Sequence, residues 1–366
     1  MTTMTRDRAG GQVLVGGGVD THADTHTAAV VDGNGGVLGT RQFPATGPGY
    51  AALLAWLASF GQVLIVGVEG TGAYGAGLAR YLQARQVALV EVDRPNRAAR
   101  RRAGKSDPLD AVAAARAALG QVATGIPKEG SGPVEALRNL RVARRSAVSQ
   151  RADCVRQIKS LLVTAAEPLR AQLRGLKTVP LLGACARLRP DRSRAGEPEQ
   201  ATKISLLALA RRHQGLSAEI TDLEKVINPL VEAINPALLA IKGVGPDTAG
   251  QLLVTAGDNP HRLVSEAAFA MLCGVAPLPA SSGKTNRHRL NRGGDRQANA
   301  ALQRVVVSRL RWDTRTQAYL ARRTGAAAGA GRAKSTAETI RCLKRYVARE
   351  IYPVLTATPR SAAQPA

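Results

Sequence analysis

Aromatic residues and cysteines are scarce in this chain of 366 residues. Phe, Trp and Tyr make up 3% of it, so stacking of nucleic-acid bases on aromatic side chains can contribute little to binding. The four cysteines, Cys154, Cys185, Cys273 and Cys342, form no Cys-x-x-Cys pair. The sequence therefore argues against a zinc site and against a disulfide framework.

Long apolar runs are also missing. No stretch reaches the roughly 20 apolar residues that span a membrane, and the N-terminus lacks the apolar core of a secretory signal. We therefore expect a cytoplasmic protein with no membrane partner.

Acidic side chains are the third scarce group. The chain has 51 Lys and Arg against 27 Asp and Glu, a formal net charge of +24. Residues 241–366 hold 20 of the basic and 7 of the acidic side chains. A region this basic attracts polyanions, and nucleic acid is the first candidate. An anionic membrane surface is the alternative, but the sequence has no basic amphipathic helix with an aromatic face.

The few acidic residues that are present include a closely spaced pair in residues 105–111, Lys-Ser-Asp-Pro-Leu-Asp-Ala. If a helix starts here with Pro108 in its first turn, Asp107 and Asp110 project from the same side, one turn apart. Two such carboxylates repel each other unless a cation lies between them, so the pair could form half of a divalent-metal site. A capping Asp107 beside a solvated Asp110 is the alternative.

Two further acids end apolar runs that read as buried strands. Asp20 follows residues 13–19, and Glu69 follows residues 63–68. An acid at the end of a buried strand is costly unless something compensates its charge. The alternative for each of these two acids is that its side chain lies in solvent at the end of the strand and needs no compensating charge.

The order of predicted elements in residues 12–120 is three strands, helix, strand, helix, strand and helix. We expect strands at 13–20, 27–31, 37–43, 62–69 and 87–92, and helices at 50–60, 74–83, 97–102 and from 107. Three antiparallel strands that lead into parallel ones form an α/β arrangement, in the order of the ribonuclease H-like fold. In that fold, acids on the first strand, the fourth strand and a late helix converge on two divalent metals.

The middle of the chain is expected to be helical, as a coiled-coil or helical-hairpin segment over residues 130–235. One long helix is predicted over 134–173 with a kink at Pro168, and a second over 202–234, with a loop or short turns between them at 177–200. Sevenfold spacing relates Ala147, Cys154 and Leu161 in the first helix, and Leu209, Leu216, Leu223 and Leu230 in the second. The spacing fits either dimerisation or burial within the chain.

Two motifs follow in residues 236–353, which we expect to form a mostly helical C-terminal domain before a disordered tail at 354–366. Residues 241–249 resemble a helix-hairpin-helix turn, whose backbone N–H groups contact phosphate; a structural hairpin is the alternative. The segment from Gly274 contains Ser281, Ser282 and Gly283 and precedes several arginines. A hydroxyl there could attack a phosphate, although such residues are also common in ordinary loops. A last helix pair is expected at about 295–320 and 335–352, separated by the low-complexity residues 324–331.

Taken together, these motifs resemble the Piv/MooV-type DEDD insertion-sequence transposases, the insertion-sequence one-ten group, described as bridge-RNA-guided serine recombinases. The matching pieces span about residues 12–352. They are Gly-Val-Asp at 18–20, Val-Glu-Gly-Thr-Gly at 68–72, Asp-Arg-Pro-Asn at 93–96, residues 105–111, the 241–246 turn and the Gly-x-x-Pro to Ser-Gly segment at 274–283.

The resemblance implies a RuvC-like N-terminal domain with Asp20, Glu69, Asp107 and Asp110 as catalytic, metal-binding residues for Mg²⁺, with Mn²⁺ as the alternative ion. It also implies that Ser282 forms a covalent phosphoserine link to DNA; the adjacent Ser281 is the alternative nucleophile. Donor and target DNA, a noncoding guide RNA and a homo-oligomer, from dimer to tetramer, are the implied partners. The residues expected to contact nucleic acid are Lys242, Gly243, Gly245, Lys284, Arg287, Arg289 and Arg292.

Three functions compete at this point. The first is a DNA transposase or recombinase that uses metal and serine together. The second is a RuvC-like, metal-dependent DNA junction nuclease that uses water. The third is a non-catalytic nucleic-acid-binding protein. The four acids argue against the third.

Overall fold

The computed structural model describes residues 8–9, 12–92, 106–283, 288–325 and 333–357. Two compact units make up the chain. One contains the chain up to Glu135 together with Leu252–Thr358, and the other contains Ala136–Gln251. The predicted basic helix at 97–102 and most of the low-complexity stretch at 324–331 fall outside the described residues.

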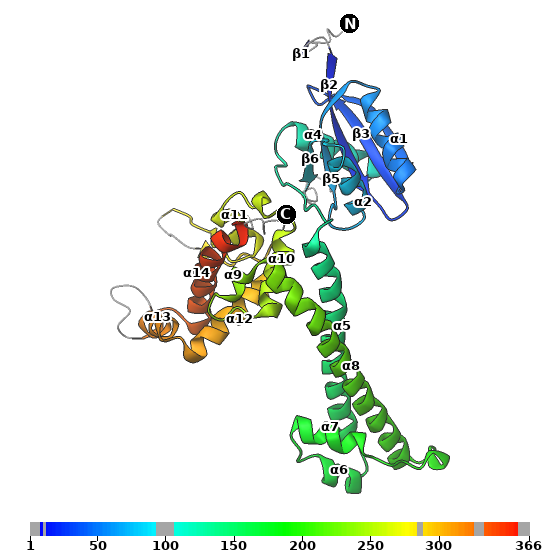
Figure 1. Cartoon of the computed structure of the whole chain (residues 1–366), viewed down its shortest axis with the longest axis vertical. Coiled ribbons are helices and arrows are strands. Elements are labelled where there is room, and N and C mark those ends of the chain that lie inside the picture. The colour runs from blue at the N-terminus through cyan, green and yellow to red at the C-terminus, as the bar shows by residue number, and fades with distance from the viewer. Residues whose placement is uncertain (1–7, 10–11, 93–105, 284–287, 326–332, 358–366) are drawn as a thin grey trace, which may run out of the picture. The chain divides into compact units, whose positions relative to one another are not determined.

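A mixed sheet forms the N-terminal part of the first unit (Figure 1). Its strands are β1 (Arg8–Ala9), β2 (Gln12–Thr21), β3 (Thr25–Asp32), β4 (Val37–Pro44), β5 (Gln62–Glu69) and β6 (Leu89–Val92). The main order is β4-β3-β2-β5-β6, and β1 pairs with β2. Because β2, β3 and β4 are antiparallel while β5 and β6 run parallel to β2, the predicted mixed α/β arrangement is confirmed and is compatible with a ribonuclease H-like domain.

Helices cover the sheet. Successive side chains of β2 point to opposite faces of the sheet, so alternate residues of β2 contact different helices. Val15 and Val19 join an apolar core with Leu53 and Leu57 of α1 (Gly47–Ala58) and with Leu78 of α2 (Ala76–Gln83). The alternate residues of β2 face α4 (Asp107–Leu119) instead. This face is built from small side chains on both sides of the contact.

Glycines allow α4 to lie directly against the sheet. A Cβ added at Gly18 would overlap the backbone of Ala111 and Ala115, and one added at Gly67 would press on the carbonyl oxygen of Ala114. The face of α4 that packs on the sheet is also made of small residues, because residues 111, 114, 115 and 118 are all buried alanines. The position of α4, and of any side chain at its start, therefore depends on glycine at these strand positions.

Gly18→Ala is expected to destabilise the protein by about 3 kcal/mol, because the added methyl meets backbone atoms rather than a side chain that could move. Gly33→Ala is the matched control, since a Cβ there meets nothing within 4 Å. Urea unfolding of both variants measures the difference, and equal midpoints would contradict this account of the α4 contact.

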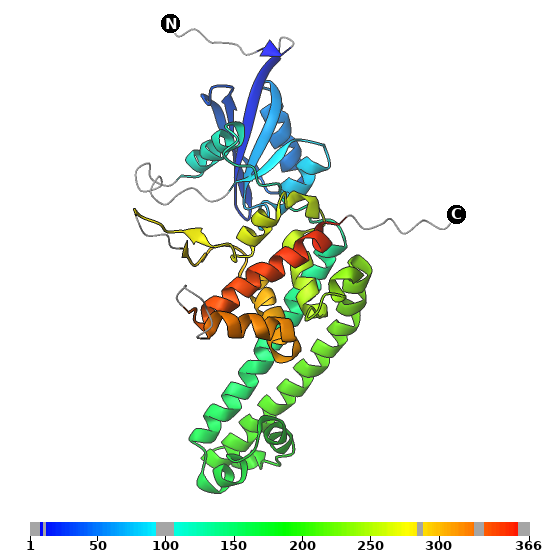
Figure 2. The same cartoon turned by 90° about the vertical axis from the view of Figure 1, so that its left-hand side faces the viewer.

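The second unit is a helical hairpin. Its helices are α5 (Pro133–Val163), α6 (Glu167–Leu173), α7 (Thr178–Ala186), α8 (Pro198–Ile234) and α9 (Pro236–Leu239), with a short 3₁₀ turn η1 (Arg192–Arg194). The two long helices, α5 and α8, lie side by side, with α6 and α7 at the tip (Figures 1 and 2). Ala147 and Cys154 of α5 pack against Leu216 and Ile220 of α8. Part of the sevenfold pattern is therefore buried within the chain itself.

Two predictions for this region were wrong in detail. The helix predicted over 134–173 is two helices, because α5 ends at Val163 and Pro168 lies in the first turn of α6 rather than at a kink. Residues 177–200 contain the nine-residue helix α7 where a loop or short turns were expected. Proline is tolerated in the first turn of a helix, so Pro180 is the third residue of α7 and Pro198 is the first residue of α8, and neither breaks its helix.

The remaining elements are helical apart from one short hairpin. They are α10 (Pro246–Ala256), η2 (Pro260–Arg262), α11 (Glu266–Leu272), β7 (Leu278–Pro279), β8 (His288–Arg289), α12 (Arg296–Trp312), α13 (Thr314–Thr324) and α14 (Thr336–Thr356). The predicted helix at 295–320 is split at Asp313, whose carboxylate accepts the N–H of Thr316 and caps α13. The disordered tail predicted from residue 354 was wrong for residues 354–356, because α14 continues past Pro353 to Thr356.

Residues 126–134 are hydrogen-bonded to the end of α10 and to the chain that follows it. Lys128 donates to the carbonyl oxygen of Val254 at 2.6 Å, and the N–H of Val134 donates to Asp258 Oδ1 at 2.8 Å. Arg262 donates to the carbonyl oxygen of Ile126 at 3.0 Å. Two segments far apart in sequence are thus joined within the first unit. Of the helices described, none has both the length and the apolar character to cross a bilayer.

Candidate functional site

Asp20 and Glu69 end two neighbouring parallel strands. In the register of β2 and β5, Gly18 pairs with Gly67 and Val19 with Val68, so the two acids follow at the same edge of the sheet. The Thr21 hydroxyl donates to the carbonyl oxygen of Glu69 at 2.8 Å and joins the two strand ends. Open α/β sheets usually bind their ligands just outside the carboxyl ends of the strands.

The first turn of α4 contributes two more acids to this edge. Asp20 is two residues beyond Gly18 and lies on the same face of β2, which is the face that α4 covers. Ser106 precedes the helix and Pro108 lies in its first turn, so α4 starts at Asp107 as predicted. Asp107 and Asp110 benefit from the positive end of the helix dipole. Asp110 is buried, with 7% of its surface exposed, while Asp107 is partly exposed.

A histidine that the sequence analysis did not single out lies between the acids. His22 Nε2 is 3.2 Å from Asp20 Oδ2 and 3.4 Å from Asp107 Oδ1. One ligand atom from each of Asp20, His22 and Asp107 lies within 4.8 Å of the others. His22 lies one residue beyond the end of β2, and its spacing of two residues from Asp20 was the signal that could have found it, because side chains two apart in an extended chain point to the same side.

Asp20 is harder to ionise than a free aspartate, mainly because it is buried. Burial raises the pKa of Asp20 above its ordinary value of 3.8, and the nearby carboxylates of Asp107 and Asp110 raise it further, while His22 opposes them. Asp20 is 8% exposed, so water screens this repulsion poorly. A cation at this position would relieve the repulsion.

The donor set fits a divalent cation. Carboxylate oxygens are the preferred ligands of Mg²⁺ and Mn²⁺, and imidazole is accepted by Mn²⁺ and by softer ions. Asp20, His22 and Asp107 converge from two elements, and Glu69 and Asp110 lie on the adjoining strand end and helix turn. This acidic cluster could bind a divalent metal.

Mg²⁺ is expected to raise the melting temperature more at about pH 8 than at about pH 4. Metal binding requires the Asp20 carboxylate, and the raised pKa of Asp20 lets protons compete for it as the pH falls. Thermal unfolding with and without the ion measures the shift. An equal shift at both pH values would place the bound ion elsewhere.

The predicted serine segment lies on a different element. Ser281 and Ser282 follow β7, which pairs with β8 through Leu278 opposite Arg289 and Pro279 opposite His288. Both serines are exposed, and Gly283 has a φ of +54° that favours glycine. Arg289 on β8 and Arg292 just beyond it are also exposed. Lys284 and Arg287 fall outside the residues that the structure describes.

The turn at residues 241–249 joins α9 to α10 as a compact hairpin. Gly243 has a φ of +79°, and Val244 between the glycines is buried. Asp247 in the first turn of α10 accepts from Arg141 and Arg144 of α5, at 3.0 Å each. Helix, turn and helix are thus present, and ion pairs hold the start of α10 to α5. The role of Lys242, Gly243 and Gly245 at a phosphate stays a prediction.

Comparison with known proteins identifies two matching regions. Residues 17–166, which contain all four predicted acids, match a transposase family model of the DEDD IS110 type. Residues 235–321, which contain the turn and the serine segment, match the transposase IS116/IS110/IS902 family.

A curated relative supports the same family. A stretch of 100 residues is 36% identical to an IS110 uncharacterized 43.6 kDa protein of Streptomyces coelicolor. The match covers 26% of this chain and 24% of the relative, so it spans about a quarter of that protein. Two separate regions of this chain, in this order along the sequence, are therefore similar to IS110-type insertion-sequence transposases.

Proposed function

We propose that this protein is a DNA transposase that cuts and rejoins DNA with a metal-binding acidic cluster and a serine nucleophile. The observation that carries the proposal is the convergence of Asp20 and Asp107 on His22 at the carboxyl edge of the sheet. The similarity of two regions to IS110-type transposases supports the same activity.

The acids would hold the metal. Asp20, Glu69, Asp107 and Asp110 are the proposed ligands, with His22 as an additional donor. Bound Mg²⁺, or Mn²⁺, would supply Lewis-acid stabilisation of charge at the phosphate. The glycine contacts of α4 keep Asp107 and Asp110 beside Asp20, so the site is formed before substrate arrives.

Ser282 is the proposed nucleophile, with Ser281 as the alternative. Its Oγ would give up its proton and form a bond to phosphorus while the bond from phosphorus to one deoxyribose oxygen breaks, and that oxygen takes up a proton, so no net proton is gained or lost. The resulting phosphoserine ester conserves the phosphoester bond for rejoining, which suits recombination rather than digestion. The exposed position of Ser282 on the β7–β8 hairpin leaves it open to a DNA strand. Arg289 and Arg292 are proposed to position the phosphate.

The partners follow from the family resemblance and from charge. Donor and target DNA are the proposed substrates, in the cytoplasm, and a noncoding guide RNA and a homo-oligomer of two to four subunits complete the proposed assembly. The net charge of +24 supports binding to nucleic acid of either kind.

A covalent-adduct trap tests the proposal. Purified protein, the RNA of its element and end-labelled donor and target DNA are mixed with Mg²⁺, denatured and separated on a gel. A DNA band linked to protein is expected. Cleaved DNA without linked protein would favour the water-using junction nuclease, and intact DNA in both Mg²⁺ and Mn²⁺ would favour a non-catalytic nucleic-acid-binding protein.

A further inference from the structure

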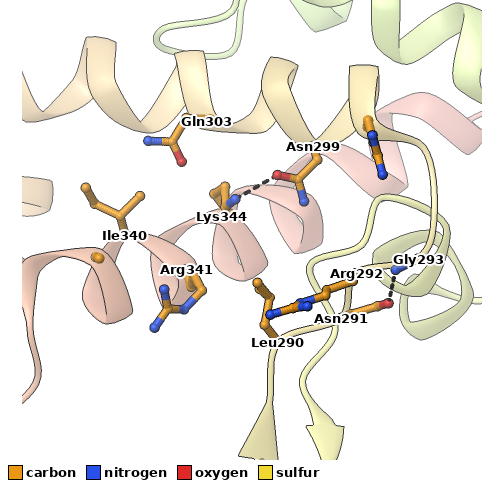
Figure 3. A pocket seen from close by; sticks show the side chains of 11 residues that line it. Leu290, Asn291, Arg292, Gly293, Asn299, Gln303, Ile340, Arg341 and Lys344 are labelled. Carbon is orange, nitrogen blue, oxygen red and sulfur yellow. Dashed lines mark hydrogen bonds between the residues drawn. The ribbon is translucent and has the colours of Figure 1, made fainter.

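A basic cavity lies among α12, α14 and the segment that follows β8 (Figure 3). Its volume is about 440 Å³. Asn299 and Gln303 reach it from α12, Arg341 and Lys344 from α14, and Arg292 from the segment after β8. A second cavity of about 410 Å³ shares Arg341 and Lys344 with it and extends toward β8.

Lys344 is the unusual residue of this cavity. Only 9% of it is exposed, which is rare for lysine, and its Nζ donates to Asn299 Oδ1 at 2.8 Å. The amide of Asn299 is itself fixed, because its Nδ2 donates to the carbonyl oxygens of Cys273 and Gly274. The ammonium is therefore held in a defined direction by a neutral partner.

The carboxylates of α11 and α14 interact with other groups. Glu266 pairs with Arg345, Glu350 pairs with Arg309, and Glu338 forms a capping box with Ser335 at the start of α14. Among the described residues that line the first cavity, none is acidic. The first cavity therefore holds the buried Lys344 with no carboxylate on its lining, while Glu338 lies on the second cavity beside Arg341.

The electrostatics of Lys344 agree with this imbalance. Burial lowers the pKa of Lys344, and the nearby Arg341 guanidinium lowers it further. A bound anion would reverse both effects, because it would replace lost solvation and offset the repulsion between the two cations.

We propose that this cavity binds one phosphodiester of a nucleic-acid strand, with Lys344 and Arg341 on its oxygens and Asn299 orienting Lys344. The proposal rests on the proposed function, since it assigns this basic surface to the strand that the protein handles. The volume suits a single phosphate with part of its sugar, and amide side chains at Asn299 and Gln303 offer neutral hydrogen bonds beside the charges. Such a contact positions the strand without reading its sequence.

Binding to labelled 12-nucleotide single strands, one of DNA and one of RNA, tests the proposal by fluorescence anisotropy at several salt concentrations. Lys344→Met is expected to weaken binding of at least one strand about tenfold, and to reduce the slope of log affinity against log salt by about 0.7. Gln303→Glu, which adds an anion to the cavity without removing a cation, is expected to act in the same direction. Lys344→Arg is expected to restore most of the affinity.

Arg311→Gln is the matched control, because it removes one exposed positive charge at the end of α12 outside the cavity. Its affinity is expected to change less than about twofold. A loss confined to DNA assigns the cavity to the substrate, and a loss confined to RNA assigns it to the guide. Wild-type affinity and salt slope in both Lys344→Met and Gln303→Glu overturn the proposal.

These measurements need neither metal nor cleavage, so they separate this proposal from the proposed function. Cavity variants that lose affinity, in a protein whose wild type forms no covalent adduct, would leave the cavity assigned and refute the serine chemistry. If Lys344→Met fails to fold, Gln303→Glu carries the test, because it is isosteric and lies on a partly exposed position.

Discussion

Asp20→Asn is expected to abolish metal-dependent DNA cleavage and, at the same time, to stabilise the metal-free protein. The first effect follows from losing a charged ligand, and we expect at least a 10³-fold fall in rate, equivalent to several kcal/mol. The second follows from removing a buried carboxylate that Asp107 and Asp110 repel. Single-turnover cleavage and thermal unfolding of the same preparation measure the two effects.

The stabilisation should depend on pH in a definite direction. The folded-state pKa of Asp20 is raised above its ordinary value of 3.8, so the folded protein holds this proton more tightly than the unfolded chain. Tighter binding of this proton adds to the free energy of unfolding. The full contribution is present below pH 3.8, and it is lost as the pH rises through the raised pKa of folded Asp20. The advantage of Asp20→Asn should therefore be largest at neutral pH and should vanish in acid.

Asp24→Asn is the matched control for this pair of effects. Asp24 is an exposed acid just beyond β2, outside the group formed by Asp20, His22 and Asp107. Full activity and unchanged stability are expected. If Asp20→Asn cleaves DNA at the wild-type rate, the acids are structural and the proposed metal site is wrong.

Ser282→Ala is expected to eliminate the covalent protein–DNA adduct while leaving DNA binding within about twofold of wild type. The hydroxyl is the only group removed, and an exposed hairpin position costs little stability when it is changed. Ser281→Ala provides the comparison, since it changes the same group one residue away. Loss of the adduct in Ser282→Ala alone would assign the nucleophile.

The reverse pattern is equally informative. Adduct lost only in Ser281→Ala would move the nucleophile by one residue and keep the chemistry. Adduct retained in both single variants and in the double variant would refute a serine nucleophile in this segment. Mass spectrometry of the protein-linked nucleotide after nuclease digestion identifies the modified residue directly.

Much of the α/β region could be predicted because its signals are local. The apolar run before Glu69 predicted β5 with its observed bounds, and Pro108 after Asp107 marked the start of α4. The break between α5 and α6 was missed because it precedes Pro168, at residues whose own preferences do not end a helix. Helix α7 was missed because proline was read as a breaker where it lies in a first turn.

In the candidate site, too, some residues are marked by a local sequence signal and others are not. Asp20, Glu69, Asp107 and Asp110 each end or start an element, so the sequence marks them. His22 lies two residues past Asp20, beyond the strand predicted over residues 13–20, so the apolar pattern did not mark it. Lys344 has no local signal, since its burial results from three segments that meet only in the folded chain.

The hydrogen bonds between residues 126–134 and the end of α10 with the segment after it have a consequence for synthesis on the ribosome. The strands β2–β6 with α1, α2 and α4 contain their own core within the first 120 residues, so this part has its contacts as soon as it emerges. The hairpin of α5 and α8 comes next, and its partners are also near in sequence. The bonds of Lys128 and Val134 wait until residues 254–258 appear, more than 120 residues later. Because contacts distant in sequence form slowly, this junction is expected to be the last part of the first unit to close.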